Sequence, residues 1–403
     1  MSPREKVLLI FNIVIYTSLT VFSYAYVDLN LTLSRSPNIL SFTKIMQQLG
    51  YYHRPVATLF YLLFLIIAFC FFIFNLYLFY KSKVGINYLI SCTLINTAIL
   101  IFAYPFLSSD LFNYLFDAKI ILVYHVSPYI HKPLDFPTDE WLRFMRWTHR
   151  YSPYGPLWLL MSLIPAGLGF GKFILNFFAF KIFISLFHLI NSFLIFKILT
   201  KLNLKFSTFG TAFYALNPLF LIEGVANAHN DVVLATFIIL PLYFLVNKKF
   251  ALSYVSLIAG VAVKYIPILN LPWLIWMNLA SPKKDVQQFI ILNIITLTIF
   301  TYLFSSFRIT VPFVSSGATQ VQFQPWYLFW TLPLFSLIPQ MGLVLMAIAI
   351  SFGSSLRYLP FLYYGEWSQP GTVQFMQFVT IAPLIAAITI SVLVIVRRKN
   401  AEK

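Results

Sequence analysis

Charge is scarce in this chain of 403 residues, because Asp, Glu, Lys and Arg together make up only 10% of it. Hydrophobic residues make up 60%, and the mean hydropathy of +0.82 lies far above that of a soluble globular domain. No stretch is polar enough to form a separate soluble domain. These values exclude a water-soluble protein, and we predict an all-α polytopic membrane protein with one integral-membrane domain over residues 1–403.

Cysteine and glycine are scarce too, and each scarcity excludes a class of site. The two cysteines, Cys70 and Cys92, both lie inside apolar runs, which predicts core packing and excludes a disulfide framework or a cysteine-based metal site. The 14 glycines form no nucleotide-binding loop. We therefore predict no resident metal and no definite cofactor, with a divalent cation left open as an alternative.

Acidic residues number 12 against 28 basic residues, which gives a formal net charge of +16. In a membrane protein, basic residues first mark the cytoplasmic side of the spans, before they indicate nucleic acid or anionic lipid. Threading the apolar runs alternately places the basic clusters on one side and nine of the twelve acids on the other. We therefore predict a multi-pass plasma-membrane protein with cytoplasmic termini, an extracytoplasmic site, membrane lipids as partners and no nucleic acid.

The apolar runs predict a bundle of about 10–13 transmembrane or half-membrane helices. N-terminal spans occupy residues 1–107, an external catalytic loop with amphipathic interfacial helices occupies 108–172, and the rest of the bundle occupies 173–403. The first run is expected to be a retained signal anchor. Single spans are expected at 7–27, 56–80, 86–107, 173–199, 206–222, 231–246, 286–304 and 371–396, and broken hairpins at 251–277 and 326–356.

The stretch "SSDLFNYLFDAK" opens the external loop with polar side chains at helical spacing. Asp110, Asn113, Tyr114 and Asp117 follow one another three or four residues apart, so they share one face of a helix. Asp110 either caps this helix or acts as a general base. Asp117 either positions a substrate or pairs with Lys119. The stripe predicts a cleft beneath the loop.

Two Ser-Pro-Tyr turns later in the loop place Tyr129 and Tyr154 at the membrane interface. Between them, residues 137–150 interleave aromatic residues with arginines, which predicts an amphipathic helix whose arginines contact lipid phosphates. The apolar run at 155–171 is too short to span and is expected to re-enter the membrane or lie along its surface.

A second polar group lies in "NPLFLIEGVANAHND" and contains Glu223, His229, Asn230 and Asp231. A His-x-Asp pair is half a metal site, but no paired-histidine spacing accompanies it. Hydrogen bonding to a polyhydroxylated ligand fits these side chains at least as well.

Lys264 lies in the middle of an apolar run, where an ionisable side chain is a functional candidate by default. It either snorkels to the membrane surface or faces a cavity and binds a phosphate. Arg308 and Arg357 in the outer loops are equal candidates for that phosphate.

These motifs resemble those of the integral-membrane GT-C glycosyltransferases, most closely the polyprenol-phosphate-mannose-dependent alpha-mannosyltransferases. The resemblance covers residues 103–334. It rests on "SSDLFNYLFDAKIILVYHVSPY", "YSPYGPLW", "NPLFLIEGVANAHNDVV", "VKYIPILNLP" and "QPWYLFWTLP", the last of which contains Trp326 and Tyr327.

The resemblance implies a GT-C-like fold and transfer of a sugar, expected to be mannose, from a polyprenyl-phosphate donor to a glycolipid or glycan acceptor. It implies that Asp110 is the catalytic base and Asp117 the second acid. By the same resemblance, Tyr129 matches the aromatic residue of the first turn, and the group from Glu223 to Asp231 matches an outer-loop acid with amides.

The chain also departs from the family pattern. Ser127 replaces an asparagine before Pro-Tyr, the turn at 152–156 is looser, and Phe116-Asp117-Ala118-Lys119 replaces a Trp-Asp-Gly-Arg sequence. These departures affect the identity of the acceptor and the sugar more than the reaction class. A lipid-linked glycan flippase is the main alternative from another class, and a purely structural membrane subunit is a weaker one.

Overall fold

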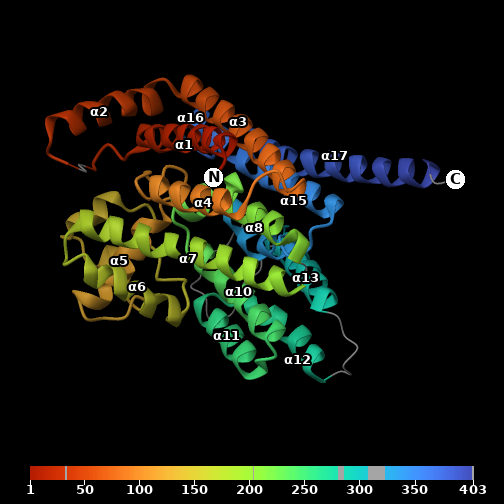
Figure 1. Ribbon diagram of the computed structural model, residues 1–403. Coiled ribbons are helices and arrows are strands. Elements are labelled where there is room, and N and C mark those ends of the chain that lie inside the picture. Colours follow the sequence, from red (N-terminus) through yellow and green to blue (C-terminus); the bar gives the residue numbers. More distant parts are fainter. Residues whose placement is uncertain (32–33, 203, 280–285, 307–322, 402–403) are drawn as a thin grey trace.

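The computed structural model describes residues 1–31, 34–202, 204–279, 286–306 and 323–401 (Figure 1). All regular structure in these ranges is helical, and five of the helices are long and apolar enough to cross a membrane. The prediction of an all-α polytopic membrane protein is thereby confirmed.

The long apolar helices are α1, α3, α7, α15 and α17. Each has more than enough rise to cross the hydrocarbon core once short helical extensions are included. Their bounds are α1 Pro3–Ser23 with η1 Tyr24–Tyr26, α3 Arg54–Tyr80, α7 Phe173–Leu202, α15 Met341–Ser355 with η9 Leu356–Tyr358 and α16 Leu359–Tyr364, and α17 Thr372–Ala401.

Shorter helices complete the described part of the chain. The apolar ones are α4 Ile86–Ile101, α6 Pro156–Leu168, α8 Ser207–Ala215, α9 Pro218–Phe220 with η6 Leu221–Ala226, α10 Asp231–Val246, α11 Phe250–Val263, η7 Ile266–Asn270 with α12 Leu271–Leu279, and α13 Val286–Ser306. The others are α2 Pro37–Gln47, η2 Gln48–Tyr52, α5 Asp110–Leu122, η3 Pro133–Asp135, η4 Glu140–Phe144, η5 Leu204–Phe206, η8 Pro325–Trp330 and α14 Leu332–Phe335.

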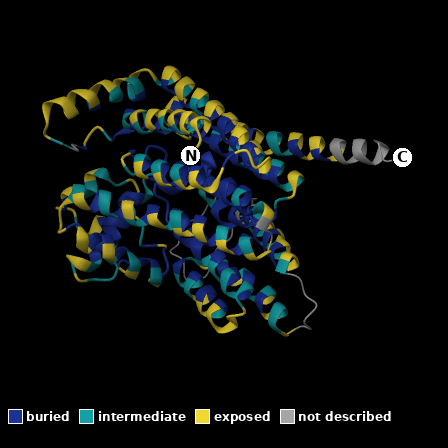
Figure 2. Cartoon of the chain, viewed as in Figure 1, coloured by how far each residue is buried: buried dark blue, intermediate teal, exposed yellow. Residues whose placement is uncertain are grey.

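Helix α7 lies at the centre of the molecule and packs against α4, α5, α6, α8 and α10. Buried residues concentrate around it, whereas exposed side chains line α1, α2 and α3 (Figure 2). Many of those exposed side chains are apolar, among them Ile10, Leu59 and Ile66. An apolar outer surface of this kind is stable against lipid and not against water.

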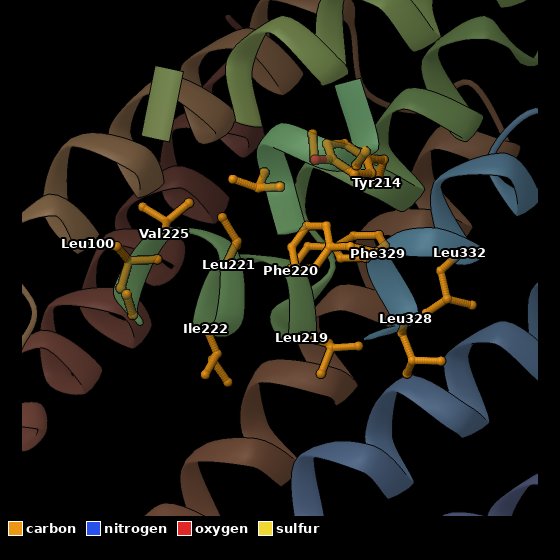
Figure 3. Packing of buried hydrophobic residues seen from close by; sticks show 14 of the residues in the cluster. Leu100, Tyr214, Leu219, Phe220, Leu221, Ile222, Val225, Leu328, Phe329 and Leu332 are labelled. Carbon is orange, nitrogen blue, oxygen red and sulfur yellow. The ribbon is translucent and has the colours of Figure 1, made fainter. Parts of the chain in front are cut away.

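The core beneath the polar loops is aromatic. Phe220 lies 4.7 Å from both Tyr214 and Phe329, measured between ring centroids, and thereby joins α8, α9 and η8 (Figure 3). Edge and offset contacts between rings at this distance add to the free energy gained from burial alone. This packed aromatic cluster supports the polar loops that lie next to it.

Two breaks in the helices bring polar groups inward. The 206–222 region, predicted as one continuous span, bends by 44° between α8 and α9. Asn217 follows the end of α8 and caps α9, since its side-chain oxygen accepts from the Leu219 N–H at 3.0 Å. The predicted break near Lys264 is confirmed, because α11 ends at Val263 and Lys264 is extended.

Other predictions made from the sequence need correction. The amphipathic helix expected over 137–150 shrinks to the short turn η4, since Asp139 and Trp141 contact Lys119 of α5 and the backbone is extended at Met145. Cys92 is buried as predicted, but Cys70 is exposed on α3. Helix α2 was not predicted. The break expected near Pro339 is present between α14 and α15, but the hairpin expected over 326–356 is wrong, because α15, η9 and α16 together form one apolar stretch, Met341–Tyr364, that is long enough to cross a membrane.

Candidate active site

Asp110 is the first residue of α5, and its carboxylate faces a histidine rather than the helix end. Ser109 occupies the N-cap position, and no side chain caps the helix there. Asp110 Oδ2 lies 3.4 Å from His229 Nδ1, and the Asp110 side chain is 21% exposed. The capping alternative is therefore not what the structure shows, and the carboxylate is both accessible and paired.

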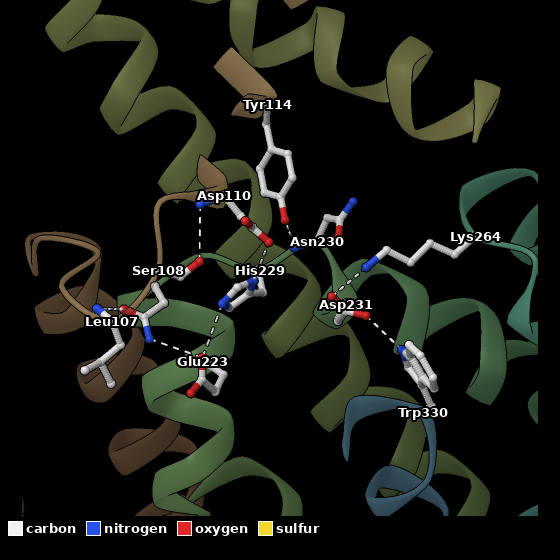
Figure 4. Close-up of polar contacts among 11 residues, drawn as sticks. Leu107, Ser108, Asp110, Tyr114, Glu223, His229, Asn230, Asp231, Lys264 and Trp330 are labelled. Carbon is white, nitrogen blue, oxygen red and sulfur yellow. Dashed lines mark hydrogen bonds and ion pairs between the residues drawn. The ribbon is translucent and has the colours of Figure 1, made fainter. Parts of the chain in front are cut away.

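His229 lies between two carboxylates. Its Nε2 is 3.3 Å from Glu223 Oε2, and both of these side chains are fully buried (Figure 4). Glu223 belongs to η6 and is therefore not the loop acid that the sequence predicted. Asn227 helps to hold the row formed by Asp110, His229 and Glu223. Its side-chain N–H donates to Glu223 Oε2 at 3.2 Å, and its side-chain oxygen accepts from the Leu107 N–H at 3.2 Å.

The two carboxylates decide the charge of His229. Burial alone lowers the pKa of the imidazole, but the close contacts with Asp110 and Glu223 outweigh burial and raise its pKa from 6.5 to about 9. His229 is therefore an imidazolium at neutral pH, held between two acids.

The stability of the protein should reflect this charge. A raised histidine pKa stabilises the folded state below pH 6.5, and that stabilisation is lost as the pH rises through about 9. Its upper limit is about 3 kcal/mol, from 1.36 kcal/mol per pH unit. We expect the melting temperature in detergent to fall more between pH 6.5 and 9.5 for wild type than for His229→Gln. Equal slopes would contradict the paired imidazolium.

A second ion pair borders the same region. Lys264 Nζ lies 2.7 Å from Asp231 Oδ2, and Trp330 Nε1 donates to Asp231 Oδ1 at 2.8 Å. Asp231 is buried at the start of α10, whereas Lys264 is 20% exposed. The helix break makes this pairing possible, because extended backbone at residue 264 carries the lysine away from the axis of α11.

The external loop is fixed to the same break. The Gly155 N–H donates to Val263 O at 3.0 Å, and a Cβ on residue 155 would lie 2.2 Å from Ala262 O. Only glycine allows so close an approach between the two backbones. Lys264 Nζ then lies 5.9 Å from the ring centroid of Tyr154.

Aromatic rings pack around the two ion pairs. Tyr114 makes edge contacts with Tyr154 at 5.1 Å and with Trp158 at 5.0 Å, and its hydroxyl accepts from the Asn230 N–H at 3.3 Å. On the other side, Trp326 stacks on His229 with a centroid distance of 4.1 Å.

Two further predicted residues support this packing. Tyr327 stacks on Trp330 at 4.4 Å, and the Tyr129 hydroxyl donates to Tyr154 O at 2.8 Å. In the described part of the chain, neither atom of the buried Asn230 side-chain amide has a hydrogen-bond partner, and the same holds for Asn113 Oδ1. A ligand with several hydroxyl groups would satisfy these atoms.

Asp117 lies on the same face of α5 but does not pair with Lys119, which contradicts one of the two predicted roles. Lys119 Nζ instead lies 2.6 Å from Asp139 Oδ2. Burial raises the pKa of Asp117 from 3.8 to about 7, and Ser152 only partly opposes this shift. Asp117 therefore titrates near neutral pH.

Replacing Asp117 should stabilise the protein. A buried carboxyl group with a raised pKa destabilises the fold as the pH rises from about 4 to 7, by at most about 4 kcal/mol. We expect Asp117→Asn to raise the melting temperature at pH 8 and to have a smaller effect at pH 4.5. Asp135→Asn, at an exposed site, serves as the control. A lower melting temperature than wild type at pH 8 would refute the assignment.

The structure separates the three basic candidates for binding a phosphate. Lys264 lies beside the Tyr154 ring and pairs with Asp231, close to the Asp110 cluster. Arg357 is buried elsewhere, and its guanidinium donates to Met376 O at 3.0 Å and Phe323 O at 2.8 Å, so it joins segments of backbone. Arg308 lies outside the described residues.

Metal binding has little support in this geometry. Across the ranges that the structure describes, no group of three or more His, Cys, Asp and Glu side chains is arranged to hold a metal ion. His229 uses a different ring nitrogen toward each carboxylate, so Asp110 and Glu223 lie on opposite edges of the ring. An ion cannot reach all three from one point.

An apolar groove of about 490 Å³ lies elsewhere, between α1 and α2. Its lining residues are Ile13, Val14, Thr17, Ser18, Val21, Phe22 and Met46. None of them belongs to the polar cluster, so the groove is not the site that contains Asp110.

Reasoning from the sequence missed Trp158 and Trp330 as site residues. Both lie in quoted motifs next to predicted residues, and Trp158 is fully buried against Tyr114. A tryptophan in an apolar run is usually an interface or core residue. Trp158 and Trp330 differ from such residues only by their contacts in the folded structure, with Tyr114 and Asp231 respectively.

Comparison with known proteins found one family. The family model described as "Alpha-(1->6)-mannopyranosyltransferase, N-terminal domain" matches residues 17–280, which is more than half of the chain and includes Asp110, His229 and Lys264. No curated protein and no solved structure matched.

Proposed function

Because the chain belongs to the alpha-(1->6)-mannopyranosyltransferase family, we propose that it moves mannose from a polyprenyl-phosphate donor to a glycan hydroxyl. The acceptor in this proposal is a lipid-linked or cell-surface glycan. Membership makes the protein a GT-C-like mannosyltransferase and favours transfer over a flippase. The contact between the partly exposed Asp110 carboxylate and the buried His229 is the observation that carries the proposal.

Asp110 would act as the general base. Its carboxylate removes the proton from the acceptor hydroxyl while that oxygen forms a bond to the anomeric carbon. The bond from the anomeric carbon to the phosphate oxygen breaks on the opposite face, so the configuration inverts. The proton remains on Asp110, and the lipid phosphate leaves with the electron pair.

His229 would orient the carboxylate of this base. Its Nδ1 lies 3.4 Å from the Asp110 carboxylate and orients it, while Glu223 contacts the other ring nitrogen from the buried side. The stacked ring of Trp326 holds the imidazole in its plane. The Asp110 carboxylate is therefore held in one orientation toward the acceptor.

The mannose ring would lie among the aromatic side chains and the amides without partners. Asn230 and Asn113 offer donors and acceptors for its hydroxyls, and Tyr154 offers an apolar face for its C–H groups. Asp117, on the same face of α5, would position the substrate. Tyr129 would act indirectly, by holding Tyr154.

Lys264 would stabilise the leaving phosphate. Its ammonium is partly exposed, lies beside Tyr154 and is oriented by Asp231. A fixed cation stabilises the negative charge that develops on the phosphate, so no proton donor is required. The basic clusters would place both termini in the cytoplasm and this site on the opposite side of the membrane.

A transfer assay with defined donors tests the proposal. Purified protein in detergent or liposomes would receive a panel of polyprenyl-phosphate sugars together with membrane glycolipid extract. We expect the mannose donor to be consumed and an inverted α-linked product to form. Consumption of a different sugar, or retention of configuration, would refute the donor or the mechanism. If no donor is consumed while labelled glycolipid crosses liposome membranes, the protein is a flippase.

A further inference from the structure

Lys181 is a fully buried lysine in the first third of α7. A charged side chain inside a membrane span is costly and needs partners. Within the described ranges, no ion pair contains Lys181. It also cannot snorkel, because its whole side chain is enclosed.

Its partners are two backbone carbonyl groups. Lys181 Nζ donates to Ala103 O at 2.5 Å and to Ala226 O at 2.7 Å. Ala226 is the last residue of η6, and Ala103 lies in the turn that ends α4. Carbonyls at and just beyond a helix end lack partners within the helix and can accept from a side chain. Lys181 Nζ therefore satisfies two carbonyl oxygens from two different segments.

The two carbonyls begin the two segments that form the active site. From Ala103 the chain leads through Leu107 to Asp110, and from Ala226 it leads through Asn227 to His229. The same segments meet twice more, because Leu107 N–H donates to Asn227 Oδ1 and Asp110 contacts His229. Lys181 is thus one of three contacts that join the two segments, and it lies at the start of both.

We infer that Lys181 is a positioning residue that joins the ends of α4 and η6, so that the Asp110 carboxylate meets the His229 imidazole. This inference rests on the proposed function for its kinetic part. A displacement of about 1 Å at a reacting group can lower a rate by about a hundredfold. Lys181 acts through backbone only and does not touch the reacting atoms.

Three variants test the inference. Lys181→Met keeps the length of the side chain but removes both hydrogen bonds, whereas Lys181→Arg keeps hydrogen-bond donors at the end of a long side chain. Lys197→Met is the matched control, because Lys197 is exposed on the same helix. Lys181→Gln, which keeps a donor, replaces Lys181→Met if that variant does not fold.

We expect Lys181→Met to lower kcat roughly 10- to 100-fold with little change in the donor KM, and Lys181→Arg to recover most of the loss. Hydrogen exchange, read by mass spectrometry, should accelerate together in residues 103–110 and 226–230 of Lys181→Met, and not in Lys197→Met. The exchange measurement does not depend on transfer. If wild type transfers no mannose, the proposed function fails while coupled exchange still supports the link.

Two results would overturn the inference. One is unchanged exchange in both segments of Lys181→Met. The other is a variant that melts earlier but turns over at the wild-type rate at a temperature where both are folded, since a merely structural lysine would behave in that way.

Discussion

Asp110→Asn is expected to lower kcat for mannose transfer roughly 1,000-fold, within the 100- to 10,000-fold range typical of a lost general base. The amide keeps the shape of the side chain but cannot accept the proton of the acceptor hydroxyl. The carboxylate is the accessible member of the acid–imidazole–acid row, so no buried neighbour can replace it. Turnover of labelled donor, measured at saturating acceptor, checks this result.

Asp135→Asn is the matched control, since Asp135 lies in the same external segment, is exposed and takes no part in the row. It should transfer mannose at the wild-type rate. A wild-type rate in Asp110→Asn itself would remove Asp110 as the base. A rise in donor KM with unchanged kcat would make Asp110 a binding group instead.

Asp231→Asn is expected to destabilise the protein by about 3 kcal/mol, the lower end of the range for breaking a buried ion pair, because Lys264 keeps some exposure. The amide oxygen can still accept from Trp330, so the loss reports the charge rather than the hydrogen bond. Unfolding in detergent at graded denaturant concentrations measures the effect.

The double variant Asp231→Asn/Lys264→Met separates the ion pair from other effects of residue 231. Removing both charges leaves no unpaired charge, so the double variant should recover most of the lost stability. If the two single effects simply add, the two charges are not coupled, and Lys264 then has another partner.

Local signals were sufficient for part of the site. The spacing from Asp110 to Asp117 predicted one helical face, and the charge of Lys264 followed by prolines predicted a broken helix; α5 and the break after Val263 are both present. Each feature depends on residues close in sequence. Turn and helix chemistry of this kind is readable without tertiary contacts.

Distant contacts account for what the sequence did not predict. Residues 137–150 carry an amphipathic pattern, but Lys119 of α5 pairs with Asp139 and lies 4.1 Å from the Trp141 ring centroid. These contacts outweigh the weak local preference for helix. Glu223 was expected in a loop, yet the bend after α8 places it in η6 beneath His229. Neither partner could be found from spacing alone.

The backbone hydrogen bond from Gly155 N–H to Val263 O joins the external loop to the end of α11. The two backbones approach so closely there that no side chain fits at residue 155. Tyr154 and Lys264 each adjoin this bond and therefore cannot move independently. A displacement of α11 would therefore move the Tyr154 ring and the Lys264 ammonium group together, relative to Asp110. The two side chains on either side of Gly155 and Val263 would then approach or leave Asp110 in the same movement.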